Sequence, residues 1–216
     1  MIHIVLYRPE KPQNTGNIMR TCVAIHATLH IIGPITFSVE NKDLQRVGMD
    51  YIDDLKMEFH PTYDDFIKAY PNADTYYVTR YARTVYSSYD FSKKQISDIF
   101  LMFGRESTGI PHDILKAHQD KLMRIPMVPE ARSLNLSNCV ALVTYEVLRQ
   151  QGFPNLATEE AIKGPTFYLK TELLFVFVYR YLLIVQIKLI LLYPVNVYFD
   201  APDKWFGFIF DVFKLR

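Results

Sequence analysis

The chain has 216 residues, half of them hydrophobic, and a formal net charge of +1 at pH 7. This is enough apolar material for one large domain, or for one domain with an appendage. The near-neutral charge excludes the strong basic excess common in nucleic-acid-binding proteins, so any RNA site must be a local cluster or be assembled between subunits. The N-terminus lacks a basic stretch followed by a long apolar one, so no signal peptide is expected.

The first two thirds of the chain alternate between strand-like and helix-like segments. Ile2–Tyr7 is apolar and β-branched, which predicts a buried strand of a parallel sheet. Asn14 to Asn17 are expected to form the turn into a helix over IMRTCVAIHATL, where Gly16 permits a positive φ. Further strands are expected at His30–Gly33, Lys56–His60, Thr75–Thr79 and Ile99–Phe103, and helices at Lys42–Val47 continuing through Met49–Leu55, at Asp64–Tyr70 and at Pro111–His118.

The segment from Arg124 to Gln150 organises the rest of the prediction. An apolar run interrupted by two prolines passes into a polar loop and then into a helix from about Cys139, with Ser137 or Asn138 as its N-cap. The apolar face of this helix is expected to comprise Val140, Leu142, Val143, Val147 and Leu148. Taken together, the segments predict an α/β fold with helices on both faces of the sheet.

Metal ligands are not expected. His26 and His30 are four residues apart, but His30 begins a strand and no third ligand is evident. Cys22 and Cys139 have no C-x-x-C spacing and lie among apolar residues, which indicates buried, reduced thiols in a cytosolic protein.

Three loops, PQNTGNIMR, LMFGRESTGIP and IPMVPEARSLNLSN, each follow an expected strand. With these motifs in this order, the chain from Ile2 to about Gly152 resembles the SPOUT class of RNA methyltransferases. It is most similar to the short TrmL/YibK-like branch, which methylates the 2'-hydroxyl of the wobble cytidine or uridine of tRNA. The resemblance implies a SPOUT-type, mostly parallel sheet with a C-terminal deep trefoil knot, a rare exception to the rule against threaded chains. It also implies S-adenosylmethionine as cofactor, tRNA as substrate, a homodimer and a cytoplasmic location.

Site residues follow from the same resemblance. Arg20 would activate or position the ribose hydroxyl, and because arginine stays protonated, electrostatic stabilisation is favoured while proton abstraction stays open. The remaining catalytic positions implied are Asn14, Asn17, Asn135 and Ser137, which would shape the loops. The cofactor-binding positions implied are Val78, Gly104, Ile125 and Ser133, with Glu106 and Asn138 beside them. A backbone without Cβ at Gly104 could approach an adenosine closely.

Expected RNA contacts are Arg80, Arg83, Arg105, Arg132 and Tyr145. Each arginine is also explained as a solvated surface charge, and Tyr145 as an interface residue. Two other functions stay open: 2'-O-methylation of another RNA such as rRNA, and a non-catalytic RNA- or membrane-associated protein. The chain begins at its first core strand, without the N-terminal RNA-binding domain usual in longer rRNA-acting relatives, which favours tRNA.

Composition changes near Pro165, so residues 1–164 are expected to form the methyltransferase domain and 165–216 an atypical hydrophobic extension. The last 52 residues hold 14 of the 31 aromatic residues but 4 of the 23 acidic ones. Leu173–Tyr193 has the length of a membrane span, but Arg180 and Lys188 within it disfavour that interpretation. An extension that packs on the domain or a partner, and read-through past a disrupted stop codon, are the alternatives.

Overall fold

A computed structural model describes residues 1–37, 54–93, 98–167, 169 and 178–185. The chain divides into two compact units, Met1–Leu156 and Ala157–Arg216. The helix expected from Lys42 lies outside the described residues, as does most of the extension. Among the residues that are described, no helix combines the length and apolar character needed to cross a membrane.

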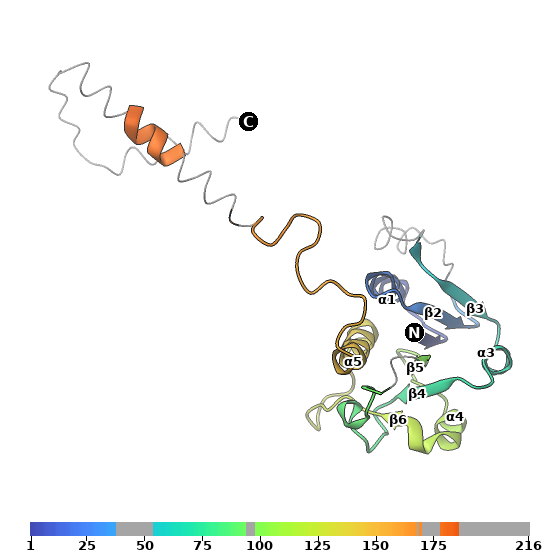
Figure 1. Ribbon diagram of the computed structural model, residues 1–216. Helices are drawn as coiled ribbons and strands as arrows, with labels where there is room; N and C mark the ends of the chain where they lie inside the picture. The colour runs from blue at the N-terminus through green and yellow to red at the C-terminus, as the bar shows by residue number, and fades with distance from the viewer. Residues whose placement is uncertain (38–53, 94–97, 168, 170–177, 186–216) are drawn as a thin grey trace. The chain divides into compact units, whose positions relative to one another are not determined.

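The first unit is built on a six-stranded sheet in the order β3-β2-β1-β5-β4-β6 (Figure 1). Every pairing between neighbouring strands is parallel, which confirms the expected type of sheet. All residues of β1, β2 and β5 are buried, as is typical of strands covered on both faces. The strands are β1 (Ile2–Tyr7), β2 (Thr28–Ile32), β3 (Met57–His60), β4 (Asp74–Val78), β5 (Ile99–Phe103) and β6 (Leu122–Met123).

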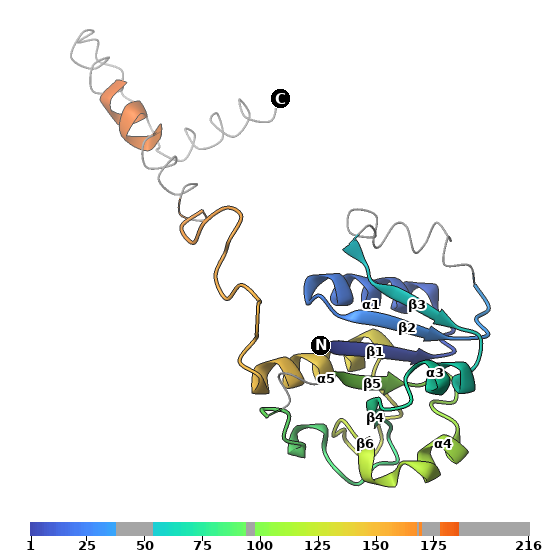
Figure 2. The same cartoon turned by 45° about the vertical axis from the view of Figure 1, so that its right-hand side comes forward.

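Helices cover both faces of this sheet (Figure 2). One core cluster joins alternate residues of β1, Ile4 and Leu6 among them, to helices α1 and α5. The other cluster joins Val5 and Tyr7 to helices α3 and α4. This alternation follows from the two-residue period of a strand. The helices are α1 (Pro12–Ala24), α3 (Tyr63–Ala69), α4 (His112–Ala117) and α5 (Leu136–Gln150), and η2 (Tyr86–Ser88) and η3 (Gln119–Lys121) are short 3-10 helices.

Helix α1 begins earlier than expected. Its first residue is Pro12, whose restricted φ suits the first position of a helix. Asn14 and Gly16 therefore lie inside the helix, so the turn expected there is wrong, and Gly16 does not use the positive φ that glycine permits. The helix also ends earlier than expected, because His26 has a φ of 53° and the chain turns into β2 at Thr28.

Helix α5 also begins upstream of its expected start. Asn135 is its N-cap and accepts a hydrogen bond from the backbone N–H of Ser137, so the predicted caps Ser137 and Asn138 instead lie in the first turn. On its buried face Thr144 takes the place expected for Leu142, which is 45% exposed. Residues four apart share a helix face and residues two apart do not, so Thr144 aligns with Val140.

Candidate active site

A cavity of about 580 Å³ lies where the loops after β4, β5 and β6 meet the first turns of α1 and α5. Its volume is within the range of small-molecule sites, roughly 300–1,000 Å³. The residues that line it are Lys11, Asn14, Val78, Thr79, Arg80, Tyr81, Phe103, Gly104, Arg105, Glu106, Ser107, Thr108, Gly109, Ile125, Met127, Arg132, Ser133, Leu134, Asn135, Leu136 and Cys139. All three loops singled out in the sequence therefore contribute to one cavity.

Two glutamates connect the loop before α1 to the loop after β5 by hydrogen bonds. Glu106 accepts hydrogen bonds from the backbone N–H groups of Glu10 and Lys11, at 2.8 and 3.2 Å, and from the Asn14 amide at 3.0 Å. Glu10 in turn accepts from the Arg105 guanidinium at 2.7 Å and from the Ser107 hydroxyl and N–H at 2.8 and 2.9 Å. The hydrogen bonds from Ser107, followed by those from Arg105, hold the pKa of Glu10 below its usual value.

Asn135 connects the third loop to this network of hydrogen bonds. Its side-chain oxygen accepts from the N–H and hydroxyl of Ser137, and its side-chain nitrogen donates to Asn14 at 2.9 Å. Asn14 is buried and donates in turn to Glu106. Ser137, Asn135, Asn14 and Glu106 thus form a continuous chain of hydrogen bonds linking α5, α1 and the loop after β5.

Glycine at position 104 is required by the loop itself. A Cβ there would lie 2.2 Å from the backbone of Gly109 and Ile110. Gly109 has a φ of 74°, and it exchanges backbone hydrogen bonds with Arg105 across the turn. The loop itself therefore requires glycine at this position, whereas the approach of Gly104 to an adenosine stays a prediction.

The predicted site residues divide into two groups. Those that line the cavity are Asn14, Val78, Arg80, Gly104, Arg105, Glu106, Ile125, Arg132, Ser133 and Asn135. Those outside the lining, as far as the described residues show, are Arg20, Asn17, Ser137, Asn138, Arg83 and Tyr145. Arg20 and Asn17 are both exposed on α1. Because Arg20 follows the cavity residue Asn14 by six positions, it lies about 9 Å further along the helix axis.

Several lining residues were not singled out from the sequence. Lys11 precedes α1, and Tyr81, which is 62% exposed, lies between Arg80 and Arg83 in the sequence. The aromatic residue in RYAR after an expected strand was the available signal for Tyr81. Cys139 is partly buried rather than fully buried, and burial raises the pKa of its thiol, which keeps it protonated near neutral pH.

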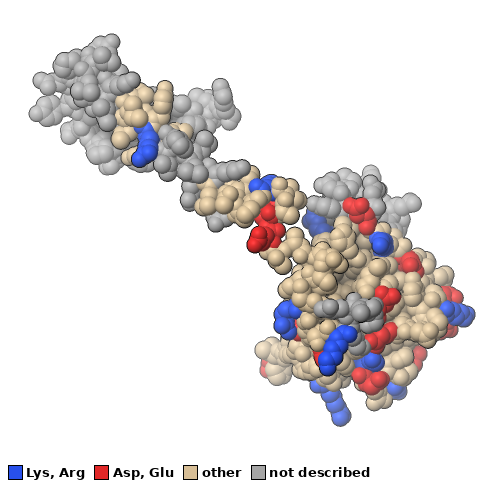
Figure 3. All heavy atoms as spheres, in the orientation of Figure 1, with Lys and Arg blue, Asp and Glu red and all other residues tan. Residues whose placement is uncertain are grey.

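The charge of the cavity lining differs from that of the face drawn in Figure 3. On the face drawn in Figure 3, acidic and basic side chains of the described residues are interspersed over the first unit. The cavity lining, by contrast, combines the basic residues Lys11, Arg80, Arg105 and Arg132 with one acidic residue, Glu106, among the positions described. Its local excess of positive charge suits a substrate with phosphate groups.

Residues 1–145 match the family model described as the SpoU rRNA Methylase family. Because this match spans more than half of the chain, the chain belongs to that family of methylases.

Two relatives of this chain carry more specific names. A protein of Geobacillus stearothermophilus, provisionally named a tRNA (cytidine(34)-2'-O)-methyltransferase, is 45% identical over 72% of this chain and 99% of its own length. The tRNA (cytidine(34)-2'-O)-methyltransferase of Escherichia coli K12 is 42% identical over 71% of this chain and 96% of its own. The crystal structure of a provisionally assigned RNA methyltransferase from Bacillus anthracis superimposes with a TM-score of 0.70, at 40% identity, over 74% of this chain and 100% of that chain.

Proposed function

We propose that this protein transfers a methyl group from S-adenosylmethionine to the ribose 2'-hydroxyl of the wobble nucleotide, cytidine or uridine 34, of tRNA. The observation that carries the proposal is the identity of 45% and 42% to two relatives named for this reaction at cytidine 34, over almost their full lengths. The two free cysteines and the tRNA substrate fit a protein that works in the cytosol.

The cavity fits the proposed cofactor by the chemistry of its lining. Apolar side chains of Val78, Ile125 and Met127 share the cavity with the polar groups of Ser133 and Asn135. Such a lining suits a ligand with an adenine ring at one end and a charged amino-acid group at the other. When bound, S-adenosylmethionine supplies an electrophilic methyl group on a sulfonium. Val78 and Ile125 would hold the adenine, and Ser133 a polar part of the cofactor.

We expect positive charge, rather than a carboxylate base, to promote the reaction in this cavity by stabilising the transition state. Glu106 already accepts three hydrogen bonds from the loop before α1 and from Asn14, so we assign it the role of holding the loops together. A guanidinium remains protonated, so Arg20 would lower the energy of the developing alkoxide, or of the flanking phosphate, without taking the proton. The hydroxyl proton is then released to solvent.

Arg20 would act across a homodimer. It does not line the cavity of its own chain among the residues described, although Asn14 on the same helix does. A second copy that packs against α5 could bring its own Arg20 to the cavity. Leu142 and Tyr145, 45% and 46% exposed on α5, provide apolar surface for such a contact.

RNA would be held at the cavity mouth by phosphate contacts and by stacking. Arg80 and Arg132 are exposed cavity residues and would contact phosphates together with Lys11. Arg105 is less suited to this role because it is paired with Glu10. Tyr81, whose ring lies 5.9 Å from the Arg80 guanidinium, could stack on an unpaired base of the anticodon loop.

The proposal includes a deep trefoil knot formed by the chain from β6 to α5. The loop after β4 is held by later parts of the chain at two places. Arg124 exchanges backbone hydrogen bonds with Thr84 and Tyr86, and the side chain of Gln150 accepts from the N–H of Phe91. A loop that encloses a threaded chain needs contacts of this kind. A crystal structure traced without breaks through this loop tests whether the chain is knotted.

The direct test of the proposed activity uses the full chain with S-adenosylmethionine and unmodified tRNA. Mass spectrometry of nuclease digests should find a new 2'-O-methyl group in tRNA, and a parallel reaction with rRNA tests the family's other substrate. Cofactor binding without transfer to any tRNA would contradict the proposal. Arg20→Ala should bind cofactor nearly as the wild type does and lose transfer, and an equal loss of both would contradict the role given to Arg20.

A further inference from the structure

Three histidines lie side by side on the sheet face that α3 covers. His3, His30 and His60 belong to the neighbouring strands β1, β2 and β3, and all three are buried. The rings of Phe66 and Tyr70 stand edge-on against both His30 and His60. None of these described residues lines the cavity, so the cluster has no part in the site above.

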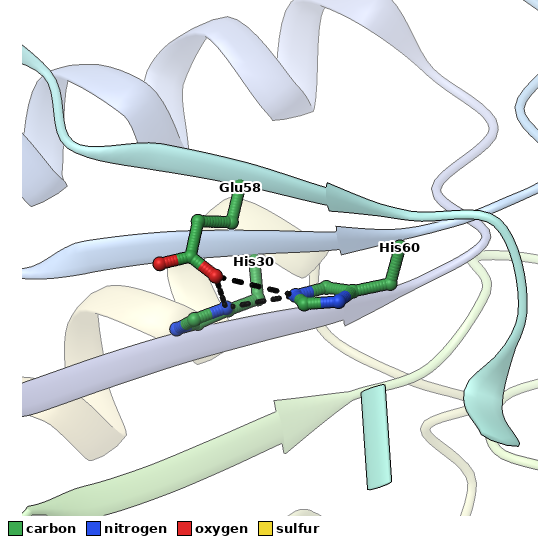
Figure 4. Close-up of side chains that lie close together, drawn as sticks. All are labelled: His30, Glu58 and His60. Atoms are coloured by element: carbon green, nitrogen blue, oxygen red, sulfur yellow. Dashed lines mark hydrogen bonds and ion pairs between the residues drawn. The ribbon is translucent and has the colours of Figure 1, made fainter. Parts of the chain in front are cut away.

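Glu58 closes this cluster at the edge of the sheet. It pairs in register with His30 and precedes His60 by two residues, so all three side chains project from the same face. Figure 4 shows the Glu58 carboxylate reaching toward both imidazoles. His30 Nδ1 lies 3.1 Å from His60 Nε2, and Glu58 Oε2 lies 3.7 and 3.8 Å from these two nitrogens.

The three atoms form a triangle of the size that a transition-metal ion occupies. For sides of 3.1, 3.7 and 3.8 Å, the point equidistant from the corners lies about 2.1 Å from each, which is the length of Zn–N and Zn–O bonds. Two imidazoles and a carboxylate suit Zn²⁺ or a similar ion, whereas Mg²⁺ and Ca²⁺ take oxygen ligands. We propose that His30, His60 and Glu58 form a site for Zn²⁺ or a chemically similar divalent transition-metal ion, with water completing its coordination.

The surroundings of these ligands match the outer sphere of a metal site. If His30 binds through Nδ1, its Nε2–H can donate to His3 Nδ1, which lies 2.8 Å away. The Tyr70 hydroxyl donates to Glu58 Oε2 at 2.7 Å, which orients the carboxylate. Outer partners of this kind set the tautomer and direction of metal ligands.

A metal ion could also reach this cluster from solvent. The Glu58 side chain is 47% exposed, whereas that of His60 is 8% exposed and that of His30 fully buried, so the ion has a route from solvent past Glu58. Because its ligands come from β2 and β3, the ion would fasten the edge strand to the sheet.

The test uses the untagged full chain, stripped with a chelator and titrated with Zn²⁺ alone in a calorimeter. One ion should bind per chain, and Zn²⁺ should raise the melting temperature. Glu58→Gln keeps a group that can accept from Tyr70 but removes the charged ligand, so it should weaken binding at least about tenfold, the least that loss of an outer-sphere partner usually costs. Glu130→Gln, an exposed glutamate in the loop before α5, is the matched control and should bind as the wild type does.

The absorption spectrum of wild-type protein loaded with Co²⁺ distinguishes this site from one at a cysteine, without any variant. Nitrogen and oxygen ligands should give visible bands without a thiolate charge-transfer band. A thiolate band, binding unchanged by Glu58→Gln, or no binding at all would each overturn the proposal.

Discussion

Four side chains hold the cavity together at the scale of single residues. Glu10 and Glu106 each accept bonds from the loop that carries the other, and Asn14 and Asn135 extend the network to α5. Because these groups come from distant parts of the sequence, each bond also fixes how two loops lie relative to one another. The network therefore determines the shape of the cavity as well as its stability.

Replacement of Asn135 should affect both properties. Asn135→Ala removes the N-cap of α5 and the bond to Asn14, and loss of a cap typically costs about 1 kcal/mol in the free energy of unfolding. We expect a lower denaturation midpoint and a loss of methyl transfer larger than the loss of stability explains. Asn72→Ala, in the exposed turn before β4, is the control. Equal behaviour of the two variants in both assays would contradict the role of the network.

The pair formed by Glu10 should make stability depend on pH. The folded-state pKa of Glu10 is lowered from its ordinary value of 4.5 by hydrogen bonds from Ser107 and then from Arg105. Its stabilising contribution is therefore complete above pH 4.5 and is lost as pH falls through the lower folded-state pKa.

Thermal unfolding of Glu10→Gln and wild type across this range isolates that contribution, since all other carboxyl groups titrate in both proteins. The wild type should melt at the higher temperature well above pH 4.5, and the difference should shrink below it. A difference that stays constant down to the acid limit would show that the ionised form of Glu10 contributes nothing to stability beyond its neutral form.

Among the elements, the turn after β5 is the most constrained part of the site. Gly104→Ala places a Cβ 2.2 Å from the backbone at positions 109 and 110, so the turn must shift. We expect cofactor affinity to fall strongly, as measured by titration calorimetry. Gly152→Ala is the control. Its added Cβ would meet no other atom, but alanine would be strained at the φ of 74° that Gly152 adopts. That variant should lose stability but keep cofactor affinity. The opposite ranking would place the cofactor elsewhere.

The sequence predicted some elements closely and misplaced others for physical reasons. Apolar runs, interrupted in β1 by His3 alone, defined β1 and β5 at their observed ends, because strands buried on both faces consist almost entirely of apolar residues. Asn14 suggested a turn because asparagine is common there, but its amide is used for a tertiary bond inside α1. Local preference does not reveal a partner that lies 92 residues away.

The candidate site was predictable in outline and less so in detail. Three polar loops that each follow a strand of one parallel sheet must meet at the same edge, so their convergence could be expected. The position of Arg20 outside the cavity could not be expected, because it depends on where α1 begins. The cluster of His30, Glu58 and His60 depends on strand register, which the spacing of residues along the chain does not reveal.

At the scale of the whole molecule, the role proposed for Arg20 requires two chains. If Arg20 acts in the partner's cavity, a mixture of Arg20→Ala and Gly104→Ala chains, each inactive alone, should regain activity. Mixed dimers then contain one cavity with an intact lining and a functional arginine, so random assembly gives roughly a quarter of wild-type activity. Methyl transfer by the co-refolded mixture is the measurement. Failure to regain activity in proven mixed dimers would place Arg20 at the cavity of its own chain.

Position-specific methylation of tRNA tests the central claim most directly. The full chain is incubated with S-adenosylmethionine and single tRNA transcripts that differ only at nucleotide 34, and each digest is mapped by mass spectrometry. We predict one 2'-O-methyl group per tRNA, at cytidine or uridine 34, and a sharp decline in transfer when salt is raised, since phosphate contacts weaken. Methylation at another nucleotide, or transfer to rRNA with none to tRNA, would contradict the account.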